Sequence, residues 1–214
     1  MICRRLGRCS FIFTRRCISV KHDLDYLRRW LLASRRERID AAASIAFAIL
    51  LFWFLGNVMS PFLAPSGSID LGNDGLVGAD DKADEISGIE SGFARFFYNA
   101  GDTNCHQHAD RSFFLNGNQM PFCARCTSIF LGLAIGAAVL IFLDLEVHIL
   151  WLLVALVPIG LDGGIQLVTD YESTNLMRFI TGAIAGIAAG IALGYIVSEL
   201  GKMAVMRKRV KKGS

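Results

Sequence analysis

Apolar residues along the chain gather into four long runs that polar segments separate. Asp162 is the only charged residue within these runs. Each run is close to the roughly 20 residues that cross a hydrocarbon core as a helix, and the second can extend back through Cys126. The pattern predicts an all-α fold class, a polytopic membrane helix bundle with four transmembrane helices. The runs cover residues 41–59, 127–143, 149–168 and 179–198.

The overall composition agrees with a membrane protein. Of the 214 residues, 53% are hydrophobic, and the mean hydropathy of +0.45 is too high for an ordinary soluble domain. The lipid bilayer is therefore the expected partner, no nucleic-acid partner is expected, and the oligomeric state stays open. The chain divides into a basic tail (1–40), a first span (41–59), an acidic flexible loop (60–100), a membrane domain with three spans (101–198) and a second basic tail (199–214).

The charge distribution predicts how these spans are oriented. Lys and Arg crowd both ends of the chain, whereas residues 66–91 are rich in acid, Gly and Ser and are expected to be exposed and flexible. Because cytoplasmic flanks carry the excess of Lys and Arg, both termini should be cytoplasmic, which requires an even number of spans in the cell membrane. The acidic loop and the cysteine-rich segment after it then lie outside. An organellar transit peptide is an alternative interpretation of the basic N-terminal segment.

Candidate metal ligands are concentrated in residues 105–126, which hold three of the six cysteines. Cys123 and Cys126 form a Cys-x-x-Cys pair, which can clamp one metal ion because both sulfurs point to the same side of a single turn. Cys105 and His106 can complete a tetrahedron from a second turn. Thiolate and imidazole ligands favour zinc or another late first-row metal over magnesium or calcium. The spacing therefore predicts a zinc site at the outer face of the membrane.

Other chemistry is open to the same cysteines. Cys123 and Cys126 could form a thiol–disulfide couple with Cys105 as a shuttle, Cys105 could bridge to one of them, or the thiols could be inert. Within the metal interpretation, an adjacent Cys-His pair chelates less comfortably than a second Cys-x-x-Cys pair, and His108 is an alternative to His106. The cysteines of the basic tail lack chelating spacing and receive no role: Cys3, Cys9 and Cys17.

Polar residues within or beside the spans form a second candidate group. Asp162 and Gln166 lie one helical turn apart on one face of the third span. Asn175 and Arg178 are one turn apart at the start of the fourth, and the predicted topology brings both pairs to the level of Arg125. A charged side chain at the middle of a span costs about 2.5–3.5 kcal/mol, so Asp162 is a candidate functional residue. An alternative is a purely structural ion pair between Asp162 and Arg178.

Small residues predict how two of the spans pack. Glycines recur at a spacing of four in the fourth run and again in the second. A face of glycines lets another helix backbone approach closely, which gives van der Waals contact where no hydrophobic driving force exists between helices. The fourth span should therefore pack on the second. The two faces consist of Gly182, Gly186, Gly190 and Gly194, and of Gly132 and Gly136.

Several short motifs follow one another between residues 101 and 198. They are Cys105-His-Gln, Arg111-Ser-Phe-Phe, Gln119-Met-Pro-Phe-Cys-Ala-Arg-Cys-Thr127, Pro158-x-x-x-Asp162-Gly163-x-x-Gln166 and Glu172-Ser-x-Asn175-x-x-Arg178-x-x-Thr181-Gly182. Together they resemble a family of small prokaryotic membrane proteins known as domain of unknown function 2085. The resemblance implies a multi-span membrane protein and no particular reaction. It favours His106 as the fourth ligand, because the family has no fixed histidine at the position of His108; Ser128 stands where the family has glycine.

These observations support three hypotheses for the function. The first is a metal-dependent membrane enzyme, such as a hydrolase or transferase, acting on a small polar or lipid-linked substrate. In it a metal with an open position activates water, Asp162 serves as a base, and Arg125 or Arg178 holds an anionic group. The second is a membrane thiol–disulfide oxidoreductase, although no thioredoxin-like pattern precedes the cysteine pair. The third is a non-enzymatic scaffold or transporter subunit stapled by its metal site.

Overall fold

The computed structural model describes residues 43–73, 82–143 and 147–213. The predicted basic tail of residues 1–40, with its three cysteines, lies outside these residues, as does the middle of the predicted acidic loop. Within them, four helices are long and apolar enough to cross a membrane: Ala43–Leu63, Ala124–Phe142, Ile149–Val168 and Asn175–Val197. The predicted all-α membrane bundle with four candidate spans is confirmed.

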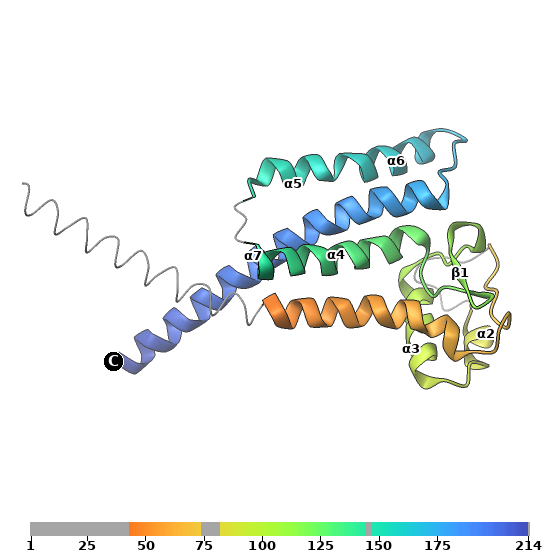
Figure 1. Cartoon of the computed structure of the whole chain (residues 1–214), viewed down its shortest axis with the longest axis horizontal. Coiled ribbons are helices and arrows are strands. Elements are labelled where there is room, and N and C mark those ends of the chain that lie inside the picture. The colour runs from red at the N-terminus through yellow and green to blue at the C-terminus, as the bar shows by residue number, and fades with distance from the viewer. Residues whose placement is uncertain (1–42, 74–81, 144–146, 214) are drawn as a thin grey trace, which may run out of the picture. The chain divides into compact units, whose positions relative to one another are not determined.

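The elements follow the order in which the spans and the connecting segments were predicted. The first span ends in a 3₁₀ helix, and the only strands in the described chain form a two-residue hairpin. The C-terminal basic segment continues the last helix well beyond the fourth span. The bounds are η1 Ser60–Leu63, α2 Ala83–Ser87, α3 Gly92–Asn104, η2 Ala109–Arg111, β1 Phe114–Leu115, β2 Asn118–Gln119, α4 Ala124–Phe142, α5 Ile149–Ala155, α6 Val157–Val168 and α7 Asn175–Gly213 (Figure 1).

The third span is divided into two helices, α5 and α6. Pro158 stands in the first turn of α6. Proline has no backbone N–H to donate and its ring clashes with the preceding turn, so it is tolerated in the first turn of a helix but not within one. At the break, the Leu156 N–H bonds the carbonyl of Leu153 at 3.1 Å, and α6 begins with the Gly160 N–H bonded to the carbonyl of Leu156.

The fourth span packs on the second through the predicted glycine faces. Helices α4 and α7 run side by side (Figure 1), and at their contact a Cβ added to Gly186 would lie 2.5 Å from the carbonyl oxygen of Ile129. A Cβ added to Gly190 would lie 2.5 Å from the carbonyl oxygen of Leu133. Only a residue without a side chain permits such a close approach of two backbones. The predicted packing is confirmed.

The chain from the 3₁₀ helix at the end of the first span to the start of α4 forms a folded unit, which we call the cap (residues 60–73 and 82–122). Residues 66–91, predicted as an exposed loop, are mostly exposed in their described parts, but they also supply four of the six residues of a small hydrophobic core, which the prediction did not include. The acidic side chains there are exposed, so the segment looks solvated in composition although its isolated apolar residues point inward. The core consists of Ile69, Leu71, Ile86, Ile89, Ala94 and Tyr98.

Buried amides hold the hairpin of the cap to the chain that follows the first span. The Asn118 side chain donates to the Pro61 carbonyl at 2.7 Å and accepts from the Ile69 N–H at 3.0 Å. The Gln119 side-chain oxygen accepts from the Leu71 N–H at 2.8 Å. Both side chains are fully buried, so these bonds satisfy groups that water cannot reach. They fix the segment that leads into Cys123.

Aromatic and polar contacts attach the cap and α4 to the first span. The Phe97 ring of α3 lies over Gly56, where any side chain would overlap it, and its centroid is 5.3 Å from that of Trp53. Nearby, the buried amide of Asn57 donates to the Thr127 hydroxyl of α4 at 2.9 Å. The end of α3 and the start of α4 are thereby held at the same end of the first span.

A candidate metal centre at the start of α4

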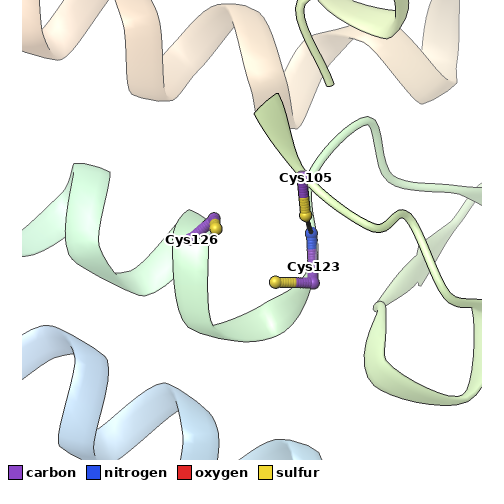
Figure 2. Close-up of side chains that lie close together, drawn as sticks. All are labelled: Cys105, Cys123 and Cys126. Carbon is purple, nitrogen blue, oxygen red and sulfur yellow. Dashed lines mark hydrogen bonds between the residues drawn. The ribbon is translucent and has the colours of Figure 1, made fainter. Parts of the chain in front are cut away.

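Three cysteines from two parts of the chain meet where the cap joins α4. Cys105 follows the last residue of α3, Cys123 is the N-cap of α4, and Cys126 lies in its first turn. Their sulfurs all lie within 4.8 Å of one another (Figure 2). Cys105 is buried and the other two are half-buried, and all three are free thiols. The sequence prediction that these three residues form one site agrees with this geometry.

The way in which α3 ends positions Cys105 beside the start of α4. The Cys105 backbone is extended, so the helix stops there, and its N–H closes the last turn on the Gly101 carbonyl at 2.7 Å. The Gln107 backbone then turns back with a φ of 49°, and its buried amide donates to the carbonyls of Tyr98 at 3.1 Å and Pro121 at 2.9 Å. These bonds pin the chain after α3 to the residues that immediately precede Cys123.

Backbone N–H groups point at the sulfurs. The Cys123 N–H donates to the Cys105 sulfur at 3.4 Å, the dashed contact in Figure 2. The backbone N–H of Gln107 acts on this sulfur as well, and those of Arg125 and Cys126 act on the sulfur of Cys123, where each favours the charged form. Such bonds orient the sulfurs and favour their charged forms. This is the arrangement that thiolate ligands of a cation require.

The three thiols compete for charge when no cation is present. Hydrogen bonds from Cys105 and Cys126, followed by the backbone N–H groups, hold the pKa of Cys123 far below its ordinary value. The hydrogen bond to Cys123 in turn raises the pKa of Cys105 to about 11. One sulfur can carry a charge that two neighbouring thiols stabilise, but a second charge so close is repelled. A cation removes this conflict, because it attracts all three thiolates.

His106 does not join the three cysteines. Its side chain is exposed, and it lies outside the group of ligand atoms that the sulfurs form. Cys105 and Gln107 on either side both point inward, and successive side chains of an extended chain point to opposite sides. The His106 ring instead lies beside that of His108, with centroids 5.7 Å apart. The structure therefore brings together three of the four predicted ligands.

The cluster has nearly the dimensions of a metal site. With Zn–S bonds of about 2.3 Å, two sulfurs of a tetrahedral site are about 3.8 Å apart. The sulfurs here all fall within 4.8 Å, so a contraction of about 1 Å or less would suffice. Three close cysteines could hold a metal ion, and within the described parts of the chain no fourth ligand atom joins them.

The predicted polar group lies between α4, α6 and α7. Asp162 is buried and forms an ion pair with Arg125, and its carboxylate also accepts from the Ser173 hydroxyl at 3.4 Å. The Gln166 amide donates to the Asp162 carbonyl and to the Ser173 hydroxyl. Arg178 is buried in the same group, so the predicted polar residues face one another rather than lipid. This costly burial is offset by pairing.

The partner of Asp162 differs from the one that the sequence suggested. Arg178 donates to Gln166 and Asn175, and the Asp162 carboxylate pairs with Arg125. Gly163 of α6 lies beside this guanidinium, since a Cβ added there would be 3.8 Å from Arg125 Nη1, an ordinary van der Waals contact. The alternative of an Asp162–Arg178 ion pair is therefore wrong. Sequence spacing within one helix could not reveal a partner from α4.

Sequence reasoning gave no role to two charged residues at the edge of this group. Arg111 in η2 forms an ion pair with Glu172 at 2.5 Å, and the Asn175 amide donates to the carbonyls of Asp110 and Ser112 nearby. These contacts join the cap to the start of α7. The sequence did contain an indication that these two residues matter, since Arg111 and Glu172 both occur in the short motifs that carry the family resemblance.

Comparisons with known proteins agree with this resemblance. Residues 105–192 match a family described as "Predicted membrane protein (DUF2085)". A protein of Methanothermobacter thermautotrophicus, named only as uncharacterized, is 34% identical over 90 residues, which are 41% of this chain and 81% of that protein. The chain belongs to the DUF2085 family. The uncharacterized protein MJ1492 of Methanocaldococcus jannaschii is 44% identical over 87 residues. These residues are 38% of this chain and 56% of the relative, so the chain spans only about half of that protein. No solved structure matches the chain.

The limits of the DUF2085 match have a structural meaning. The matched region begins at Cys105 and ends at Ala192. It therefore includes all three cysteines of the cluster, the polar group and the closely packed glycines of α4 and α7. The first span, α2 and α3 lie before it. The part shared with the family is thus the part that contains both candidate sites.

Proposed function

We propose that this protein is a membrane metalloprotein in which Cys105, Cys123 and Cys126 hold one zinc ion at the junction of the cap and α4. The close grouping of the three sulfurs carries the proposal. The N–H groups directed at Cys105 and Cys123 support it, because they stabilise thiolate ligands. Sulfur ligands suit zinc better than the hard cations magnesium and calcium.

The open fourth position favours an enzyme over a purely structural site. Structural zinc sites have four protein ligands, whereas catalytic sites keep a position for water or substrate. A zinc ion bound there would supply an activated water or a Lewis acid. Arg125 lies in the first turn of α4, between Cys123 and Cys126. This arginine and Arg178 would therefore hold the anionic part of a small or lipid-linked substrate. Asp162, engaged by Arg125, would hold that guanidinium in place.

Metal analysis combined with thiol counting tests this proposal. The purified, reduced protein should contain about one zinc per chain with the cluster thiols not oxidised. His106→Ala should keep the zinc, because its side chain lies apart from the sulfurs, and His108→Ala serves as the matched control. Loss of zinc in His106→Ala but not in His108→Ala would show that His106 is a fourth protein ligand and that the zinc site is structural. Metal-free protein with a disulfide in the cluster would reject the metal centre.

A thiol–disulfide oxidoreductase is the second candidate function. Its support is the position of the Cys-x-x-Cys pair at the first turn of α4, where the partial positive charge of a helix N-terminus favours a reactive thiolate. Cys105 is close enough to act as the third thiol of an exchange. The same thiol count distinguishes the two functions, because a stoichiometric metal occupies the sulfurs that exchange would need.

We also infer that both termini lie in the cytoplasm and the cap outside. The four candidate spans are an even number, and both ends of the chain are basic. A cysteine introduced at the exposed Ser87 of α2 should react with a membrane-impermeant thiol reagent in intact cells. A cytoplasmic reporter fused to the C-terminus should be active. Labelling of the Ser87→Cys variant only after lysis would reverse the orientation.

A further inference from the structure

Among the described residues, Arg178 is a buried cation that donates hydrogen bonds to neutral groups and to no carboxylate, although Glu172 and Asp110 lie near enough to act on its charge. The residue is 4% exposed, and its guanidinium donates to two neutral amide oxygens, Asn175 Oδ1 at 3.3 Å and Gln166 Oε1 at 3.4 Å. Among the described residues, the carboxylates of this group are paired elsewhere: Asp162 with Arg125, and Asp110 and Glu172 with Arg111. A buried charge that bonds no carboxylate directly is costly, and such a group in a span is a candidate for function.

Two neighbouring arginines also have unused donors. The Nε atoms of Arg111 and Arg125 are buried and have no hydrogen-bond partner. Arg111 Nε is 3.7 Å from the nearest Asp110 oxygen, which is too far for a hydrogen bond. Both arginines are close enough to Arg178 to interact with its charge. Two guanidinium groups that each have an unpaired N–H, from η2 and α4, thus lie near the buried Arg178 of α7.

We propose that this region binds a phosphate-type oxyanion, with Arg178 as the main ligand and Arg111 and Arg125 contributing their free N–H donors. The planar guanidinium forks match phosphate oxygens in pairs. Three arginines here face three carboxylates, so the region has little net charge of its own, and a group that adds a single charge, such as a phosphate diester or singly charged phosphate, fits it best. Arg178 also lies in the first turn of α7, where backbone N–H groups favour anions.

The surroundings allow either a lipid headgroup or a free phosphate to reach these arginines. Leu176 and Met177, on the same turn of α7 as Arg178, are 67% and 47% exposed, as expected for side chains beside lipid. The binding itself requires no metal. The further step, that this oxyanion is part of an enzyme's substrate, rests on the proposed metal function. In that case the oxyanion would be the anionic part of the molecule that reacts at the zinc site.

Thermal unfolding of the purified full chain in a neutral detergent tests the binding. Probes are inorganic phosphate and a short-chain phosphatidylglycerol, with a diacylglycerol of equal chain length as the control. A ligand that binds only the folded protein raises the unfolding midpoint. The midpoint should rise with at least one phosphate probe and not with diacylglycerol. A rise with the lipid alone identifies a headgroup site, and a rise with inorganic phosphate identifies a site open to soluble phosphate.

Arg178→Gln should abolish this rise while the midpoint without ligand stays equal or increases, because the variant removes a buried charge that bonds no carboxylate directly. Arg178→Lys, which keeps the positive charge but not the planar guanidinium, should give a smaller rise of the unfolding midpoint than the wild type. Arg95→Gln is the matched control, since Arg95 bonds the Ile89 carbonyl within the cap. A lowered ligand-free midpoint in Arg178→Gln would make Arg178 structural and overturn the proposal.

An absent response to both phosphate probes would also overturn it, and so would a response that Arg178→Gln leaves unchanged. Zinc is measured in the same preparations, so that the two proposals can fail separately. Wild-type protein with zinc but without a phosphate response would reject the oxyanion site alone. Protein without zinc that still responds to phosphate through Arg178 would reject the metal function and leave the binding site standing.

Discussion

Replacing Cys123 with serine is expected to remove the metal from the purified protein and to release the cap from the start of α4. A serine hydroxyl is a much poorer ligand than a thiolate, and two sulfurs cannot hold the ion as three do. Zinc binding contributes about 10–16 kcal/mol of apparent free energy in small zinc-dependent folds, and this becomes folding free energy. The loss should therefore appear as zinc content near zero, a lower unfolding midpoint and faster proteolysis within residues 82–122.

The other cluster cysteines should behave in the same way, because each supplies one of three sulfurs. Cys17→Ser is the matched control: it makes the same chemical change in a cysteine of the basic tail that lacks chelating spacing, and it should keep both zinc and stability. Zinc retained at full occupancy in Cys123→Ser would refute the centre. Equal losses of zinc in Cys17→Ser would show that the metal is bound elsewhere.

The membrane part of this fold could be predicted from the sequence because its signals are local. A span needs only a long apolar run, and close packing of two spans needs only glycines at a spacing of one turn. The spacing of Gly186 and Gly190 is therefore enough to indicate the contact with the second span. The cap could not be predicted in this way. Ile69 and Ile86 stand alone among acidic and small residues, and they form a core only once separate segments meet.

The candidate site likewise has parts that the sequence predicts and parts that depend on tertiary structure. Cys123 and Cys126 are predictable because their spacing alone brings the sulfurs together, and Cys105 followed as the third cysteine of the segment. The direction of His106 depends on the backbone on either side of it, which no motif reveals. The partner of Asp162 also required tertiary structure, since Arg125 reaches it from α4. Pairings within one helix follow from spacing, whereas pairings between helices depend on the crossing of the helices.

Gly186→Leu and Gly190→Leu are expected to destabilise the bundle strongly. In both, the first atom of the new side chain would lie 2.5 Å from a backbone carbonyl of α4, so the two helices would have to move apart. Overpacking costs about 1–3 kcal/mol where side chains can adjust, and backbone cannot adjust so easily. We expect a loss of at least about 3 kcal/mol, which corresponds to about 6–12 °C in the unfolding midpoint of a protein of this size.

The same substitution in α6 separates packing from any general effect of leucine. A Cβ added to Gly160 or Gly164 meets no atom within 4 Å, so leucine there should be tolerated and could raise stability through its higher helix propensity. Thermal unfolding of the four variants in one detergent gives the comparison. Equal midpoints for Gly186→Leu and Gly164→Leu would mean that α4 and α7 do not touch through their glycines. A large loss only in α7 would establish this contact as the centre of the bundle, on which the placement of Arg125 between α6 and α7 depends.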